Sequence, residues 1–170
     1  MGKKDRHYID CLKILKEELL PAMGCPEPIA ISYAAAVARE TLGAVPEKLL
    51  IEVSGNIIKN VKSVVVPNTN GLRGIKAAVA AGIIAGDASK HLEVISSVSD
   101  EKKAEICRYM EKTEIKVCLA DTTLIFDIIV TAYSGESYAK VRIANYHTNI
   151  VLIEKDDKTL FSKAAADESE

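Results

Sequence analysis

The 170-residue sequence has no tryptophan, few aromatic residues and no basic excess. Aromatic residues make up 5% of the chain, and the formal net charge is −2, with lysine and arginine mixed among aspartate and glutamate. A protein that binds nucleic acid needs a basic stripe for the phosphate backbone and often aromatic side chains for stacking on bases. The composition therefore argues against nucleic acid as a partner.

Long hydrophobic runs are also missing. Residues 77–85 form one of the longest apolar stretches, far short of the roughly 20 residues that a membrane-spanning helix needs. The first residues lack the charged and apolar segments that are typical of a secretory signal. We therefore expect a cytoplasmic protein that does not bind membranes. The composition, 48% hydrophobic and 27% charged, is that of an ordinary globular protein.

The four cysteines form no CxxC pair, and no histidines stand at the spacing of a zinc site. A chain of this length can build a core without disulfides. We therefore expect neither a zinc module nor a disulfide framework. Cys11, Cys107 and Cys118 fall on helix or strand patterns in which a half-buried structural cysteine is expected. The nucleotide-binding patterns GxxxxGK[ST] and GxGxxG are absent as well, and so is the serine-hydrolase pattern GxSxG.

The first two thirds of the chain predict mostly helices. A helix over residues 7–20 should end at Pro21, and an apolar, alanine-rich helix should run from about Pro26 to Gly43 and be buried. The remaining elements expected here are strands at 49–53 and 61–66, loops at 54–60 and 67–73, and helices at 74–85, 89–98 and 101–112.

The last third changes to strand patterns. Four strands are predicted at 115–119, 123–133, 137–145 and 150–154, joined by polar turns. The expected fold class is α+β: N-terminal helices with a short strand pair, followed by an antiparallel β-meander packed on helices. We expect one domain over residues 1–163 and a disordered acidic tail over 164–170.

Two polar segments in the first half could carry chemistry. Cys25 lies in the sequence MGCPEP before the buried helix, where free N–H groups and the helix dipole favour a thiolate, and hence a metal ligand or nucleophile. The alternative is a small buried cysteine. The segment SGNIIKN, residues 54–60, could offer backbone N–H groups, an amide and an ammonium to a small anion. The alternative there is a plain structural turn.

Two further segments are candidates for binding. The sequence PNTNGLRG, residues 67–74, precedes an apolar helix; helix N-termini bind anions, and Arg73 offers a two-pronged clamp for a carboxylate. His147, in the sequence YHTN, lies at a predicted strand-to-strand turn. It could act as an acid, a base or a substrate contact, or be merely solvated.

Taken together, the segments GCPEPIAI, EVSGNIIKNVKSVVVPNTNGLRGIKAA and IANYHTNIVLIEKD resemble the L-cysteine desulfidase family in order and approximate spacing. That family is related to the α-chain of iron–sulfur L-serine dehydratases. The resemblance spans nearly the whole chain, and residues 53–77 are its most specific part. It implies a lyase that eliminates sulfide from L-cysteine to give pyruvate and ammonia, with an oxygen-sensitive 4Fe–4S cluster held by three cysteines.

The resemblance also implies roles for individual residues. It maps the first cluster cysteine of the family onto Cys25, and implies that the chain is the N-terminal part of a longer enzyme whose other cluster cysteines lie outside it. Catalytic roles are implied for His147 and Lys59. Substrate-binding roles are implied for Ser54, Gly55, Asn56, Asn60, Thr69, Gly71, Arg73, Thr148 and Asn149. The sequence departs from the family pattern at Pro26, where threonine is usual, and at Asn68 and Asn70, where glycines are usual.

The implied mechanism is similar to that of aconitase. An iron with an open coordination site binds the leaving sulfur while a base removes the α-proton, and Arg73 with residues 54–56 holds the substrate carboxylate. The 170 residues alone should not hold a competent cluster. L-Serine dehydration and a non-catalytic module for small-anion binding or assembly stay open as alternatives. The identity of the residue that removes the α-proton stays open. So does the oligomeric state, for which a homo-oligomer is one alternative.

Overall fold

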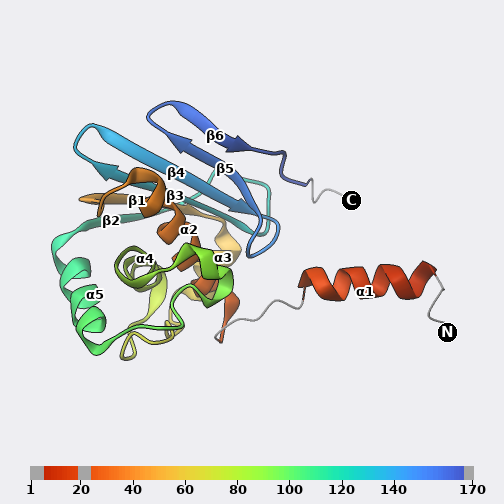
Figure 1. The fold of residues 1–170 in the computed structure, drawn as a ribbon, viewed down its shortest axis with the longest axis horizontal. Helices are drawn as coiled ribbons and strands as arrows, with labels where there is room; N and C mark the ends of the chain where they lie inside the picture. Colours follow the sequence, from red (N-terminus) through yellow and green to blue (C-terminus); the bar gives the residue numbers. More distant parts are fainter. Residues whose placement is uncertain (1–5, 19–23, 167–170) are drawn as a thin grey trace.

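The computed structural model describes residues 6–18 and 24–166 (Figure 1). In chain order, the elements are α1 (Arg6–Glu18), α2 (Pro26–Leu42), β1 (Lys48–Val53), α3 (Gly55–Val61), α4 (Gly74–Ala85), the 3-10 helix η1 (Ala88–Glu93), α5 (Asp100–Lys112), β2 (Glu114–Leu119), β3 (Asp127–Ser134), β4 (Ser137–Ala144), β5 (Ile150–Lys155) and β6 (Lys158–Ser162). None of the described helices has the length and apolar character needed to cross a bilayer. Pro21, the expected end of α1, lies outside the described residues.

The strands form one six-stranded sheet in the order β2-β1-β3-β4-β5-β6. Strand β1 is parallel to β2, and every other pair of neighbours is antiparallel. The predicted α+β class is thus confirmed, and so is the antiparallel meander from β3 to β5; the predicted strand at 115–119, β2, lies outside the meander because it pairs with β1. The predicted separate strand pair in the first half is wrong, because β1 lies inside the large sheet, between β2 and β3.

Residues 55–61 form helix α3, so the prediction of a loop over 54–60 and a strand over 61–66 is wrong. Only one isolated bridge, between Val65 and Arg73, remains of that strand. Ile57 and Val61 are fully buried, and a spacing of four residues places both on one face of a helix. Burial of this face outweighs the strand propensity of the β-branched residues.

Three other features of the secondary structure differ from the sequence patterns. Strand β3 begins at Asp127 instead of 123, and η1 contains a break at His91, where φ is 50°. Strand β6 follows a correctly predicted turn, but no strand is predicted there, because its sequence shows no apolar alternation. In the structure all its residues are exposed. Beyond β6, Ala166 exchanges two hydrogen bonds with Asn145. Residues 167–170 lie outside the described part of the chain.

Helices α2 and α4 pack closely against each other and run in the same direction. The Ser32 hydroxyl, in α2, donates to the Ala78 carbonyl at 2.6 Å, and a Cβ atom on Gly82 would lie only 2.2 Å from the Ser32 carbonyl oxygen. Further along both helices, Arg39 donates to the carbonyls of Ile83 and Gly86, each at 2.8 Å. The two helices therefore begin at the same end of the molecule.

That end coincides with one edge of the sheet. Helix α2 packs on β3 and β4, and its last residue, Leu42, accepts a hydrogen bond from Lys155 at the end of β5. The start of α2 must then lie toward the opposite edge, where β1, β2 and β4 end and β3 and β5 begin. We call this end of the strands the motif edge, because the SGNIIKN and YHTN segments both lie there.

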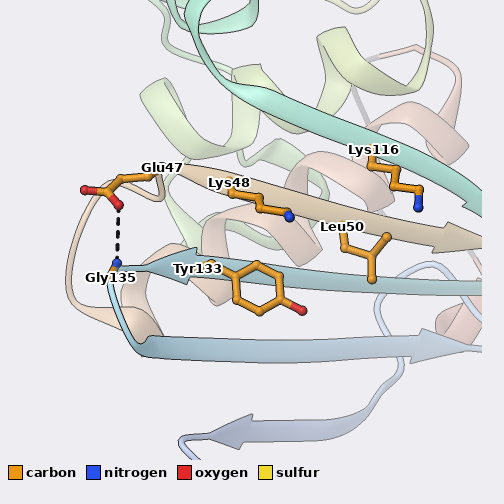
Figure 2. Close-up of a pocket in the computed structure, with 6 residues that line it drawn as sticks. All are labelled: Glu47, Lys48, Leu50, Lys116, Tyr133 and Gly135. Carbon is orange, nitrogen blue, oxygen red and sulfur yellow. Dashed lines mark hydrogen bonds between the residues drawn. The ribbon is translucent and has the colours of Figure 1, made fainter.

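The sheet face turned away from α2 carries mainly polar side chains. Lys48, Leu50, Lys116 and Tyr133 line a shallow pocket of about 460 Å³ on this face (Figure 2). Leu49 and Ile51, which alternate with Lys48 and Leu50, are fully buried on the helix side. The sheet therefore has one face in the core and one face toward water, as the alternating pattern predicts.

Candidate functional site

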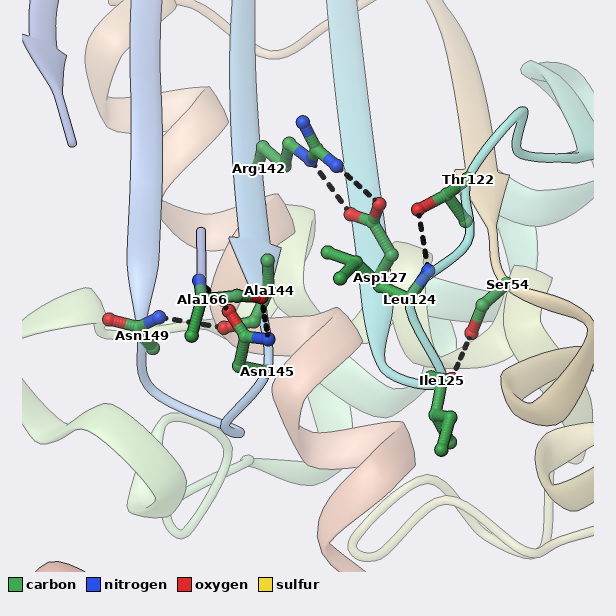
Figure 3. A network of polar contacts seen from close by, with 10 residues as sticks. All are labelled: Ser54, Thr122, Leu124, Ile125, Asp127, Arg142, Ala144, Asn145, Asn149 and Ala166. Carbon is green, nitrogen blue, oxygen red and sulfur yellow. Dashed lines mark hydrogen bonds and ion pairs between the residues drawn. The ribbon is translucent and has the colours of Figure 1, made fainter. Parts of the chain in front are cut away.

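Ser54 joins the end of β1 to the start of α3 at the motif edge. Its hydroxyl donates to the Ile125 carbonyl at 2.6 Å and its backbone N–H to the Asp127 carbonyl at 3.0 Å (Figure 3). The side chain is 2% exposed, so its hydroxyl serves to hold β1 against the start of β3. The other candidate side chains of this segment, Asn56, Lys59 and Asn60, are exposed on α3.

The YHTN segment lies beside the same stretch of chain. The His147 ring contacts the Phe126 ring, with centroids 4.6 Å apart, and its Nε2 atom is buried. The Asn145 N–H donates to the Phe126 carbonyl at 3.0 Å. Asn149 donates through its side chain to the Ala144 carbonyl at 2.7 Å, which closes the turn, and Thr148 is half-buried. Residues 125–127 thus connect the two candidate segments.

A buried ion pair anchors this connection. The Arg142 guanidinium donates to both carboxylate oxygens of Asp127, from Nε at 2.9 Å and from Nη2 at 2.6 Å (Figure 3). The Asp127 side chain is fully buried, and its hydrogen bonds raise the pKa of Arg142. The pair fixes β3 to β4 at the motif edge, beside a pocket of about 520 Å³. Sequence reasoning missed it, because the cross-strand register of the two residues had no local signal.

The PNTNGLRG loop has a left-handed backbone at four positions, the last of which is Gly74 with φ of 89°. Asn68 and Asn70 both have φ of 58°, and Gly71 has φ of 85°. Asparagine is, after glycine, a residue that adopts this conformation readily, so Asn68 and Asn70 can replace glycines without changing the backbone. The Thr69 hydroxyl is buried and donates to the Val66 carbonyl at 2.7 Å, within the loop.

Arg73 is the last residue before α4, as the sequence predicts. Its side chain is exposed, and one guanidinium nitrogen donates to the Ser63 carbonyl at 2.8 Å. This bond ties the PNTNGLRG loop to the end of α3. The remaining donors of the guanidinium suit a carboxylate.

Cys25 is the residue directly before α2, and its side chain is half-buried. The neighbouring Gly24 has φ of 100°, and a Cβ atom there would lie 3.6 Å from a side-chain carbon of Pro67. The cysteine loop is therefore seated against the PNTNGLRG loop and is neither sealed in the core nor remote from it. Cys11 is exposed on α1, and Cys107 and Cys118 are half-buried on α5 and β2.

The environment of Cys25 favours the protonated thiol, whereas the sequence predicts a thiolate. Its Sγ donates to the Glu27 carboxylate at 2.9 Å, and the pKa of Cys25 is raised by burial first and by that hydrogen bond second. Glu27 lies in the first turn of α2, where it already takes advantage of the helix dipole and opposes a second negative charge beside it. The sequence prediction treated Glu27 only as a favourable helix start, and so missed this competition.

We expect Glu27→Gln to lower the pKa of Cys25, because the substitution removes the carboxylate charge that favours the protonated thiol and leaves only a weaker, neutral amide acceptor. Alkylation by iodoacetamide depends on the thiolate, so its rate should rise at lower pH than in the unmodified chain. Mass spectrometry of each cysteine peptide measures the profile. Cys107, far along the chain on α5, is the internal control and should keep its profile. An unchanged Cys25 profile would contradict this assignment of the cause.

The four candidate segments therefore form two pairs, each brought together from separate parts of the chain. Residues 54–56 and 147–149 meet through residues 125–127, and Cys25 meets the PNTNGLRG loop where α2 and α4 begin. Within residues 6–18 and 24–166, no three histidine, cysteine, aspartate or glutamate residues are grouped so that they could hold a metal ion.

Comparison with known proteins identifies relatives of greater length. The chain is 59% identical over 167 residues to a UPF0597 protein of Desulfitobacterium hafniense, which covers 98% of the chain and 39% of that protein. It is 51% identical over 150 residues to a UPF0597 protein of Finegoldia magna, with 87% and 36% covered. It is 44% identical over 158 residues to a UPF0597 protein of Treponema denticola, with 93% and 37% covered.

No family model matches the chain. No solved structure matches it either. The chain spans less than two fifths of the length of these curated relatives. At 44 to 59% identity over nearly all of its own length, its homologues are UPF0597 proteins.

Proposed function

We propose that the chain contributes to an iron–sulfur-dependent lyase that carries out β-elimination on a small L-amino acid, with L-cysteine as the substrate. The observation that carries the proposal is the position of Cys25, a partly exposed thiol seated against the PNTNGLRG loop where α2 and α4 begin. These are the segments whose sequences resemble the L-cysteine desulfidase family.

Cys25 suits one ligand of an iron–sulfur cluster. Its side chain is half-buried, lies on a loop and is close to a carboxylate that can accept the thiol proton when a metal ion binds. The other ligands would come from outside the described residues. When bound, the cluster would supply a Lewis-acidic iron that binds the leaving sulfur of the substrate.

The residues of the chain would bind and orient the substrate. Arg73 is placed before α4, where its free donors and the helix start both favour a carboxylate. Asn56 and Lys59 project from α3 as exposed polar groups. His147 is the candidate for proton transfer, since an imidazole changes its protonation near neutral pH. The buried hydroxyls of Ser54 and Thr69 would act as structural supports, because each already donates to a backbone carbonyl.

The test uses a full-length chimera in which this chain replaces the matched segment of the Desulfitobacterium hafniense relative. After anaerobic reconstitution with iron and sulfide, we expect cluster absorbance and the release of sulfide and pyruvate from L-cysteine. Cys25→Ser should remove most of the absorbance, because a hydroxyl is a poor iron ligand. Cys107→Ser, at a half-buried cysteine on α5, is the matched control and should retain it.

Three outcomes would count against the proposal. Full cluster absorbance in Cys25→Ser would show that the thiol is not a ligand. No cluster in the unmodified chimera would favour a non-catalytic small-anion-binding module. Pyruvate release from L-serine without sulfide release from L-cysteine would assign the elimination to L-serine instead.

A further inference from the structure

Three large apolar side chains are exposed along the motif edge. Leu119, Ile125 and Tyr146 are 66%, 63% and 56% exposed. We call them the apolar rim. Leu119 ends β2 and Ile125 precedes β3, at the two ends of the β2–β3 connection, whereas Tyr146 lies in the connection from β4 to β5.

The rim residues adjoin the candidate segments. A side-chain carbon of Leu119 lies 3.8 Å from the position of a Cβ atom on Gly55, and the Ile125 carbonyl accepts the Ser54 hydroxyl. Next along the edge, residues 145 and 126, which adjoin Tyr146 and Ile125, are hydrogen-bonded. In Figure 3, the Ile125 side chain points away from the strands. The strand order places Leu119 on one side of Ser54 and Ile125 and Tyr146 on the other.

The character of the rim differs from that of the open sheet face. That face carries charged side chains, among them Lys48, Lys116 and the half-exposed Lys140, which suit contact with water. Apolar area costs about 25 cal/mol per Å² while it remains in water. Clustered apolar groups of this kind mark contact surfaces more often than isolated ones do.

The relatives provide the polypeptide that such a surface needs. The matched segment makes up 36 to 39% of the three relatives described above, so more than three fifths of each relative lies outside it. Those residues are covalently linked to the matched segment. A surface of this segment that is exposed and apolar is a natural place for them to pack.

We propose that the apolar rim is the docking surface for the rest of the polypeptide in these longer relatives, which thereby covers the motif edge. The contact encloses residues 54–56 and 147–149 and removes the three rim side chains from water. The inference does not depend on lyase chemistry, since it concerns packing alone.

Hydrogen–deuterium exchange tests the proposal by comparing the 170-residue chain with the full-length chimera. We expect backbone exchange over residues 119–126 and 145–149 to slow at least tenfold in the chimera. Exchange near Val45 and over β6 should not change, although Val45 and Leu160 are 54% and 60% exposed. Equal exchange of the rim in both proteins would overturn the proposal. Slow rim exchange in the chain alone at high concentration would overturn it as well, in favour of a second copy.

Matched variants separate docking from folding. In the chimera, Leu119→Glu and Ile125→Glu should restore fast exchange at the rim, whereas Leu160→Glu and Val45→Glu should not. In the 170-residue chain, all four variants should keep the unmodified melting temperature, because these side chains are largely exposed. Retained protection in both rim variants would overturn the proposal. These results are independent of cluster absorbance, so docking and lyase activity can fail separately.

Discussion

Gly82→Ala should lower the free energy of unfolding by about 3 kcal/mol, because α2 and α4 leave no space for a methyl group at this position. The added Cβ would lie 2.2 Å from the Ser32 carbonyl oxygen and 2.8 Å from two further backbone atoms of Ser32. Backbone atoms cannot move aside as the end of a flexible side chain can. The helices would have to separate, and the Ser32–Ala78 hydrogen bond would lengthen.

Urea unfolding followed by circular dichroism measures this loss. Gly55→Ala is the control, because a Cβ atom there makes only an ordinary contact of 3.8 Å with Leu119. This control should change stability by no more than about 1 kcal/mol and should tend to stabilise, since alanine restricts the unfolded chain. Equal stability of Gly82→Ala and the unmodified chain would show that the helices do not pack this closely.

Asp127→Ala should destabilise the chain by about 3 kcal/mol, because it leaves Arg142 without its buried partner at the motif edge. The Asp127 carboxylate is fully buried and accepts two hydrogen bonds from that guanidinium. Part of the cost is offset, since the Arg142 side chain is 32% exposed and can reach water. The loss should also loosen the adjoining Ser54 N–H bond to the residue 127 carbonyl.

The exposed pair of Lys48 and Glu114, 3.5 Å apart, provides the control. Glu114→Ala should cost less than about 1 kcal/mol, as exposed ion pairs do. A double-mutant cycle with Arg142→Ala isolates the pairwise coupling between Asp127 and Arg142. A coupling near zero would mean that the pair does not hold β3 to β4.

Local signals in the sequence were sufficient for some elements. Helix α2 begins at Pro26 and is followed by Gly43, which has φ of 79°, and both residue types mark helix boundaries through their own backbone preferences. The alternation in β4 predicts its burial pattern in the same way. These signals depend on residues near one another in the chain, so they can be recognised in a single sequence.

Other features depend on contacts between distant residues. Strand β6 exists because it pairs with β5, and α3 because Ile57 and Val61 find a core to bury against. The position of Cys25 before a buried helix was predictable, but its protonation depends on the side-chain conformation of Glu27. The meeting of residues 54–56 with 147–149 follows from strand register, which no single segment specifies.

The left-handed backbone of the PNTNGLRG loop limits which residues can stand at positions 68 and 70. Glycine and asparagine are nearly interchangeable there, whereas a valine or isoleucine would strain the turn. Exchange between asparagine and glycine would therefore leave the path of the loop intact, even though it scores as a mismatch when sequences are aligned. For this loop, the number of residue differences therefore overstates the difference in backbone conformation.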